Sequence, residues 1–301
     1  MKLDSTVYVQ RKCAICESDQ GKLIVKQNFE PRNLTKFTFS ARRLPDRLTF
    51  SWLRCEKCGL VRSDPVVDLD LEGLYGSSEF TYSDELKGLA HTYDKLFSNT
   101  VGKPDHDSSL LEVGAGNGFF LELALRAGFS KVLGLEPSLD AFRKAPTHLQ
   151  KFLTVGMIEN ANLGGNYSSV VMFHVLDHLP EPVSALEKVR SLTRSGGTIL
   201  VAVHNCRSWS ARLFRSMSPI YDVEHCYLFD KSTIRLLLIK SGYKNVKVGT
   251  YWNTYSLAYL FQLLPLPLNL KRNILNSLLG TLFRRLKLTL PLGNMWAMAK
   301  V

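Results

Sequence analysis

The stretch Leu110-Leu111-Glu112-Val113-Gly114-Ala115-Gly116-Asn117-Gly118 decides the fold of this 301-residue chain. An apolar run opens into a glycine-rich turn, and residues 118–127 follow with the pattern of a helix. Because glycine lacks a Cβ atom, the backbone of such a turn approaches a ligand closely, and the start of the helix adds unpaired N–H donors. Phe119 stands where a dinucleotide-binding protein carries its third glycine, which disfavours that class. A turn used only for packing is the alternative.

A carboxylate ends the next apolar run of the sequence. Glu136 closes the segment 132–136, about twenty residues beyond the turn. A carboxylate at that position accepts both hydroxyls of a ribose. The glycine turn followed by an acid on the neighbouring strand therefore predicts a site for a nucleoside-containing cofactor.

Helical and strand patterns alternate after residue 83, which is typical of a parallel sheet covered by helices on both faces. The predicted strands are 110–113, 132–135, 152–155, 170–173, 198–203, 245–249 and 295–299, and the predicted helices are 118–127, 139–144, 182–192 and 231–241. The fold class is thus α/β.

Four of the six cysteines lie near the N-terminus as two CxxC pairs, Cys13 with Cys16 and Cys55 with Cys58. Two such turns build the closed tetrahedral four-thiolate shell that structural zinc prefers. Residues 1–68 are therefore predicted to form a zinc-ribbon module; accidental pairs or a redox dithiol are the alternatives. The other two cysteines stand alone and are expected to be buried thiols.

Three further segments carry a family resemblance: 173–182 (FHVLDHLPEP), 224–229 (EHCYLF) and 58–61 (CGLV). With the glycine turn and Glu136, they make the chain resemble the class I S-adenosylmethionine-dependent methyltransferases over roughly residues 70–301. The resemblance is to a branch with an HVLEH segment, in which Asp177 replaces the usual Glu, and with an N-terminal zinc knuckle. It implies a Rossmann-like seven-stranded methyltransferase sheet in residues 69–301. Members commonly modify sugars, polysaccharide precursors or secondary metabolites.

The resemblance also implies which residues hold S-adenosylmethionine. They are Glu112, Gly114, Ala115, Gly116 and Gly118 for the methionine end, Glu136 for the ribose, and Pro137 and His174 beside them. Tyr75 and Tyr82, before the first strand of the domain, are expected to cap or stack on the cofactor, with interdomain packing as the alternative.

Methyl transfer to a hydroxyl needs a base, and histidine suits that role near neutral pH. His225 is the first candidate because it follows the fifth strand, on the rim where acceptors bind in such sheets. His174 and His204, each at the end of a strand, are the alternates. For each of them, a hydrogen-bonded structural histidine is the alternative role.

The segment His174, Asp177, His178 also resembles the ExxEH run with which ubiquinone-type O-methyltransferases hold a divalent ion. Here the first Glu is replaced by His174. We favour packing and cofactor contact over metal for this segment, because a third and a fourth ligand are not visible in the sequence.

The net charge of +11 is concentrated at the two ends of the chain. Residues 1–62 hold thirteen Lys and Arg against six Asp and Glu, and residues 251–301 hold six against none. Residues 251–293 combine this basic charge with leucines at helical spacing between 270 and 286, and they are predicted to form a helical cap inserted before the last strand. The cap is expected either to pack on the protein or a second copy, or to contact an anionic membrane surface.

The leading prediction is a methyltransferase acting on a hydroxyl of a small-molecule or lipid-linked glycan acceptor. An RNA methyltransferase that uses the basic zinc module is a rival, disfavoured because the middle of the chain is slightly acidic. A non-catalytic binding protein is a third interpretation. We expect a cytoplasmic location, since no apolar leader opens the sequence, with peripheral membrane contact.

Overall fold

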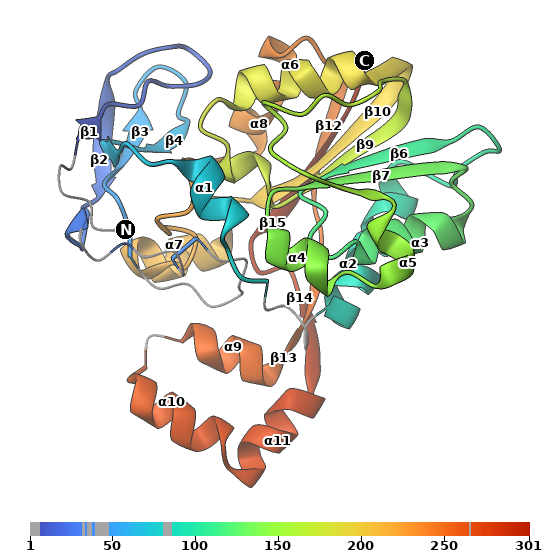
Figure 1. Ribbon diagram of the computed structural model, residues 1–301. Helices are drawn as coiled ribbons and strands as arrows, with labels where there is room; N and C mark the ends of the chain where they lie inside the picture. The colour runs from blue at the N-terminus through green and yellow to red at the C-terminus, as the bar shows by residue number, and fades with distance from the viewer. Residues whose placement is uncertain (1–6, 32–33, 35–37, 40–47, 81–85, 265) are drawn as a thin grey trace.

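A seven-stranded sheet forms the centre of the computed structural model, which describes residues 7–31, 34, 38–39, 48–80, 86–264 and 266–301 (Figure 1). Its strands run in the order β12-β15-β10-β9-β6-β7-β8. Their bounds are β6 Ser109–Val113, β7 Lys131–Glu136, β8 Leu153–Val155, β9 Tyr167–Phe173, β10 Thr193–His204, β12 Lys244–Thr250 and β15 Asn294–Lys300. β15 is antiparallel to both of its neighbours, while β10, β9, β6, β7 and β8 are mutually parallel. The predicted fold class is confirmed. Six of the predicted strands lie within six of these seven, and the predicted strand 152–155 begins one residue before β8.

Helices cover both faces of this sheet, which is why its central strands are buried and mostly apolar (Figure 1). Every residue of β6 and β9 is buried. Leu110 packs in the cluster formed with α2 (Leu86–Thr100) and α3 (Phe119–Ala127). Leu111 packs on the opposite face, in the cluster with α6 (Pro182–Leu192) and α8 (Lys231–Lys240).

Further elements complete the domain, and several of them were not predicted. α4 (Leu139–Lys144) corresponds to a predicted helix, whereas α1 (Leu71–Gly76), α2, α5 (Thr147–Gln150) and α7 (Trp209–Phe214) do not. Two 3₁₀ turns were also missed, η2 (Leu176–His178) and η3 (Arg215–Met217). A turn of three residues carries no helical periodicity, so a sequence pattern does not reveal it.

The N-terminal module is built on a four-stranded antiparallel sheet of order β11-β4-β3-β2. β2 (Gly21–Val25), β3 (Trp52–Cys55) and β4 (Val61–Ser63) come from the module, whereas β11 (Tyr227–Leu228) comes from the chain after β10. A further pair joins β1 (Tyr8–Val9) to β5 (Val66–Val67). The sheet of the module is therefore completed by a strand of the larger domain.

The insertion between β12 and β15 contains three helices and a strand pair, and Figure 1 shows these helices standing away from the central sheet. The elements are β13 (Asn253–Ser256), α9 (Leu257–Leu263), α10 (Leu268–Leu275), α11 (Leu278–Arg285) and β14 (Lys287–Leu290). The leucines predicted on one helical stretch are divided between α10 and α11, because the helix ends at Asn276 and restarts after Ser277. Within the described residues, no helix combines the length and apolar character needed to cross a membrane.

Candidate active site

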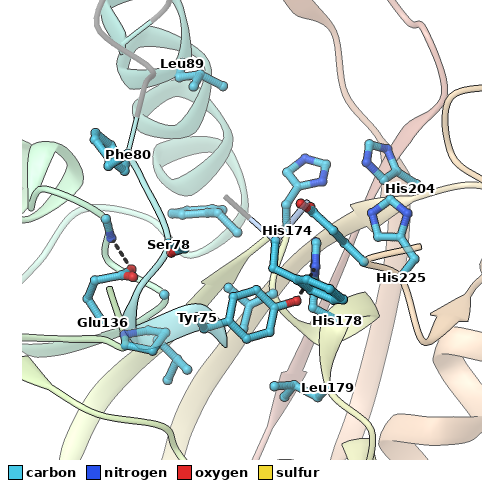
Figure 2. A pocket seen from close by; sticks show the side chains of 18 of the residues that line it. Tyr75, Ser78, Phe80, Leu89, Glu136, His174, His178, Leu179, His204 and His225 are labelled. Atoms are coloured by element: carbon cyan, nitrogen blue, oxygen red, sulfur yellow. Dashed lines mark hydrogen bonds between the residues drawn. The ribbon is translucent and has the colours of Figure 1, made fainter. Parts of the chain in front are cut away.

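One cavity of about 340 Å³ lies at the carboxyl ends of β6, β7, β9 and β10, within the usual range for ligand pockets. The glycine turn and the end of β7 form one part of its wall, and the ends of β9 and β10 with the loop 219–225 form another. β13 and α9 of the insertion contribute Asn253, Tyr255 and Tyr259. Figure 2 shows Glu136 in one region of this cavity and four histidines in another.

The glycine turn has a backbone that only glycine adopts without strain. Gly114 and Gly116 have φ values of 76° and 55°, in the left-handed region. A Cβ atom on Gly114 would lie 2.2 Å from Val175 Cγ2, and one on Gly116 would lie 2.8 Å from the ring of Phe80. Both positions line the cavity, so the backbone there is open to a bound molecule.

Two buried carboxylates, Glu112 and Glu136, face the cavity beside this turn. Glu136 accepts hydrogen bonds of 2.8 Å from the backbone N–H groups of Gly116 and Ser138, which counteract the rise in its pKa caused by burial. Burial, reinforced by the charge of Glu136, holds the pKa of Glu112 well above its usual range. Among the described residues, Glu112 Oε2 has no hydrogen-bond partner, so this oxygen is available to a ligand.

Most of the residues predicted to hold the cofactor line this cavity. They are Glu112, Gly114, Gly116, Glu136, Pro137, His174 and Tyr75. Ala115 and Gly118 do not line it: Ala115 is buried, with its Cβ on the side of Gly134, and Gly118 adopts a left-handed conformation that caps α3. Tyr82 lies outside the described residues.

Four histidines gather around Asp177, and they come from three separate segments of the chain (Figure 2). The rings of His174 and His204 lie 4.6 Å apart, and those of His178 and His225 lie 4.7 Å apart. The rings of His204 and His225, 5.3 Å apart, join the two pairs. The predicted trio of His174, Asp177 and His178 is thereby divided, because the two flanking histidines belong to different pairs.

The hydrogen bonds of this cluster determine where its protons lie. His225 Nδ1 donates to the carbonyl oxygen of Ile220 at 2.8 Å, and its Nε2 lies 3.9 Å from Asp177 Oδ2. Burial lowers the pKa of His225 to about 4 and places the pKa of His178 well below its usual value. Burial also raises the pKa of Asp177. His225 is therefore a neutral imidazole at pH 7.

Several residues that sequence reasoning missed orient these histidines. The hydroxyl of Tyr251 lies 3.0 Å from His174 Nε2, and Asn294 Oδ1 lies 3.0 Å from His204 Nδ1. Tyr75 was predicted beside the cofactor, and the structure places its hydroxyl 3.2 Å from His178 Nδ1 (Figure 2). The topology places the insertion beside the site, because β12 ends and β15 begins at the carboxyl edge of the sheet.

Residues 86–248 match a protein-family model described as "Methyltransferase domain". This chain belongs to the methyltransferase-domain family. Among curated proteins, this methyltransferase is similar to the ubiquinone biosynthesis O-methyltransferase of Paraburkholderia xenovorans, with 26% identity over 152 residues, 48% of the chain and 62% of that protein. It is also similar to the tRNA U34 carboxymethyltransferase of Campylobacter hominis, with 30% identity over 114 residues. That match covers 36% of the chain and 38% of that protein, so the chain spans less than two thirds of either relative.

Solved structures share the fold of this methyltransferase. A putative methyltransferase from an antibiotic biosynthesis pathway of Anabaena variabilis has a TM-score of 0.52 and 16% identity, covering 69% of this chain and 96% of that one. The phosphoethanolamine N-methyltransferase 2 of Haemonchus contortus, in complex with S-adenosyl-L-methionine, has a TM-score of 0.52 and 12% identity, covering 80% of this chain and 62% of that one. At these identities the likeness concerns the fold alone.

Proposed function

We propose that this methyltransferase transfers a methyl group from S-adenosylmethionine to a hydroxyl group of a small-molecule or lipid-linked glycan acceptor. The observation that carries the proposal is that a single cavity joins a glycine turn with two buried carboxylates to a cluster of four imidazoles. In-line methyl transfer depends mainly on aligning donor and acceptor, and one cavity with both sets of groups meets that need.

At the cofactor end, the residues present fit S-adenosylmethionine. The carboxylate of Glu136 is positioned to accept the ribose hydroxyls, and the backbone of Gly114 and Gly116 allows close approach of the methionine part. The Oε2 atom of Glu112 offers an acceptor to the ammonium group of the cofactor. When bound, S-adenosylmethionine supplies an electrophilic methyl group; this chain supplies its orientation.

At the acceptor end, a hydroxyl must lose its proton to become a good nucleophile. His225 is the first candidate for activating it, because His225 lines the cavity, its ring is fixed by the Ile220 carbonyl, and its Nε2 lies 3.9 Å from the buried carboxylate of Asp177. His174 and His204 are the alternates, since both line the same cavity.

A screen with radiolabelled S-adenosylmethionine tests this function. The purified chain would be incubated separately with glycolipid, nucleotide-sugar and RNA pools, and transferred label would be counted. Label in an alkali-stable methyl ether of a glycan or glycolipid is expected. If label appears only in RNA, the acceptor is RNA and the proposed acceptor class is wrong. If calorimetry detects no binding of S-adenosylmethionine, the enzymatic role is refuted.

We also propose that Cys13, Cys16, Cys55 and Cys58 bind one structural zinc ion. In support, their sulfur atoms lie within 4.8 Å of one another, with 3.3 Å between Cys13 and Cys58 and 3.4 Å between Cys16 and Cys55. Four thiolates leave no open coordination position, so the ion has a structural role. Elemental analysis of the wild type and of Cys55→Ser tests this: the variant should lose zinc, and Cys206→Ser, which lies outside the group, should keep it.

We further propose that the insertion contacts an anionic membrane surface. In support, Leu278 is 91% exposed and Leu279, Leu282 and Leu286 are each nearly half exposed on or beside α11. Exposed Arg272, Arg284, Arg285 and Lys287 accompany these leucines, and no acid follows residue 250. Each basic residue near anionic lipid contributes about 1 kcal/mol, so this surface complements anionic headgroups in both charge and apolar character.

Sedimentation with vesicles tests the membrane contact. The wild type should pellet with phosphatidylglycerol vesicles at low salt and remain in solution with phosphatidylcholine. Leu278→Asp combined with Leu282→Asp should abolish pelleting, whereas Ile239→Asp, at an exposed apolar position on α8, should not. If the wild type pellets with neither kind of vesicle, the proposal is refuted. If the double variant also has a lower mass than the wild type in light scattering, the exposed leucines contact a second copy of the chain and not a membrane.

A further inference from the structure

The insertion contributes a buried amide to the wall of the cavity. Asn253 and Tyr255 are two residues apart on β13, and side chains two apart on a strand lie on the same side of it. Both residues are buried and both line the cavity. Thr254 between them is partly exposed and pairs instead with Thr289 of β14. The alternation along β13 therefore brings an amide and a phenol to the site.

Hydrogen bonds connect this amide to the histidine end of the cavity. Asn253 Nδ2 donates to the Tyr255 hydroxyl at 2.9 Å, and Asn294 Nδ2 donates to the same hydroxyl at 3.3 Å. Asn294 lies directly opposite His204 in the register of β15 and β10, and its Oδ1 is 3.0 Å from His204 Nδ1. Asn253 is thus linked through two side chains to a histidine at the acceptor end.

The amide oxygen of Asn253 is not satisfied by this network. Asn253 is 4% exposed, and its Oδ1 has no hydrogen-bond partner among the described residues. A buried polar atom without a partner costs stability, so its presence in a folded protein needs an explanation. Because an amide oxygen only accepts, the group that would satisfy it is a hydrogen-bond donor.

We propose that Asn253 is a specificity residue, whose Oδ1 accepts a hydrogen bond from a second hydroxyl of the acceptor, next to the one that is methylated. The inference rests on the proposed function and deepens it, because it narrows the acceptor to a polyol such as a sugar ring. An acceptor with one isolated hydroxyl would leave Oδ1 unpaired in the complex, and sites built to pair with a hydroxyl reject analogues that lack it.

The side chains beside Asn253 suit the apolar part of such an acceptor. Tyr259 and Leu263, one turn apart on α9, line the cavity. The rings of Tyr255 and Tyr259 stack with 5.4 Å between their centroids and 12° between their planes. Ligand sites commonly combine such an apolar, aromatic wall with a few polar groups that fix orientation. Here the wall would contact the C–H groups of the sugar, and Asn253 would pair with a hydroxyl.

Initial rates with labelled S-adenosylmethionine on the glycolipid and nucleotide-sugar pools test this role. Asn253→Leu keeps the approximate size of the side chain and removes its oxygen, so it should raise the pool concentration at half-maximal rate at least about tenfold. Asn253→Asp keeps an acceptor oxygen and should stay within about threefold of the wild type. Cofactor affinity in calorimetry should be unchanged in both variants. Asn273→Ala, at an exposed asparagine on α10 of the same insertion, is the matched control.

Monodeoxy analogues of the glycan that the pools identify separate direct contact from a structural role. With the wild type, one analogue should have a kcat/KM at least about tenfold below that of the parent glycan. With Asn253→Leu, the same analogue should react like the parent glycan, because the contact is already lost. A substitution that only loosened the insertion would slow the parent glycan and all its analogues alike.

The outcomes distinguish this inference from the proposed function. Asn253→Leu kinetics equal to those of the wild type, an Asn253→Asp protein as impaired as Asn253→Leu, or the lack of any analogue with the expected pattern would overturn the inference and leave the proposed function intact. A wild type that labels neither pool would overturn both. If Asn253→Leu does not fold, Asn253→Ala provides the same comparison.

Discussion

Replacing Glu136 by Ala should weaken S-adenosylmethionine binding by about 1.5–3 kcal/mol, or about 13- to 160-fold in the dissociation constant. Each carboxylate oxygen accepts one backbone N–H at 2.8 Å and keeps a second lone pair for a ribose hydroxyl. Burial raises the pKa of Glu136 and these two donors oppose that rise; the stronger, charge-assisted bonds belong to the ionised carboxylate. Glu136→Gln, which keeps the size and one acceptor oxygen, should lose less than the Ala variant.

Titration calorimetry with S-adenosylmethionine measures this loss directly. Glu122→Ala is the matched control, because Glu122 pairs with Arg126 on the surface of α3 and does not line the cavity. Melting curves without cofactor would report any damage to the turn, since Gly116 also loses an acceptor in the variant. Unchanged affinity in a folded Glu136→Ala protein would mean that the ribose is held elsewhere and would refute the reasoning.

Three further substitutions test other parts of the site. His225→Ala should lower turnover about 100-fold or more with nearly unchanged cofactor affinity, in steady-state kinetics beside the exposed control His148→Ala. Gly114→Ala should destabilise the protein by about 1–3 kcal/mol and abolish cofactor binding, because residue 114 has a positive φ and an added Cβ would collide with Val175. The control Gly164→Ala adds a Cβ in open space and should change neither the stability nor the cofactor binding. The pKa of Glu112 is higher in the folded protein than in the unfolded chain, so this carboxyl group destabilises the fold once the pH rises above its pKa in the unfolded chain. Without cofactor, Glu112→Gln should therefore melt at least about 2 °C higher than the wild type at pH 7 and show no gain below about pH 4.3. Equal melting temperatures of Glu112→Gln and the wild type at pH 7 would show that the ionisation of Glu112 does not destabilise the fold.

The sheet was predictable because its strands are buried on both faces. Segments such as Val170–Phe173 are continuously apolar, and each ends where a turn or a polar residue begins. The two-residue strand β11 has no periodicity of its own, and its pairing with β4 depends on tertiary structure. Sequence patterns carry no signal for such a contact.

The candidate site was predictable in part for a similar reason. Glu112, Glu136 and the histidines at strand ends could be placed because the carboxyl ends of parallel strands meet at one edge. The pairing of His178 with His225 could not be foreseen, since it depends on the turn η2 and on the conformation of the loop 219–225. The tautomer of His225 likewise depends on one carbonyl oxygen, that of Ile220.

The strand β11 has a practical consequence for protein engineering. A fragment that starts after residue 68 would leave Tyr227 and Leu228, both buried in the whole chain, as an exposed unpaired edge that invites aggregation. It would also lose Ser63, whose hydroxyl donates to the His225 carbonyl and whose N–H donates to that of Cys226. Truncation or exchange of the N-terminal module would therefore disturb the histidine loop directly, and chimaeras of this enzyme should carry the module and residues 220–229 from the same parent.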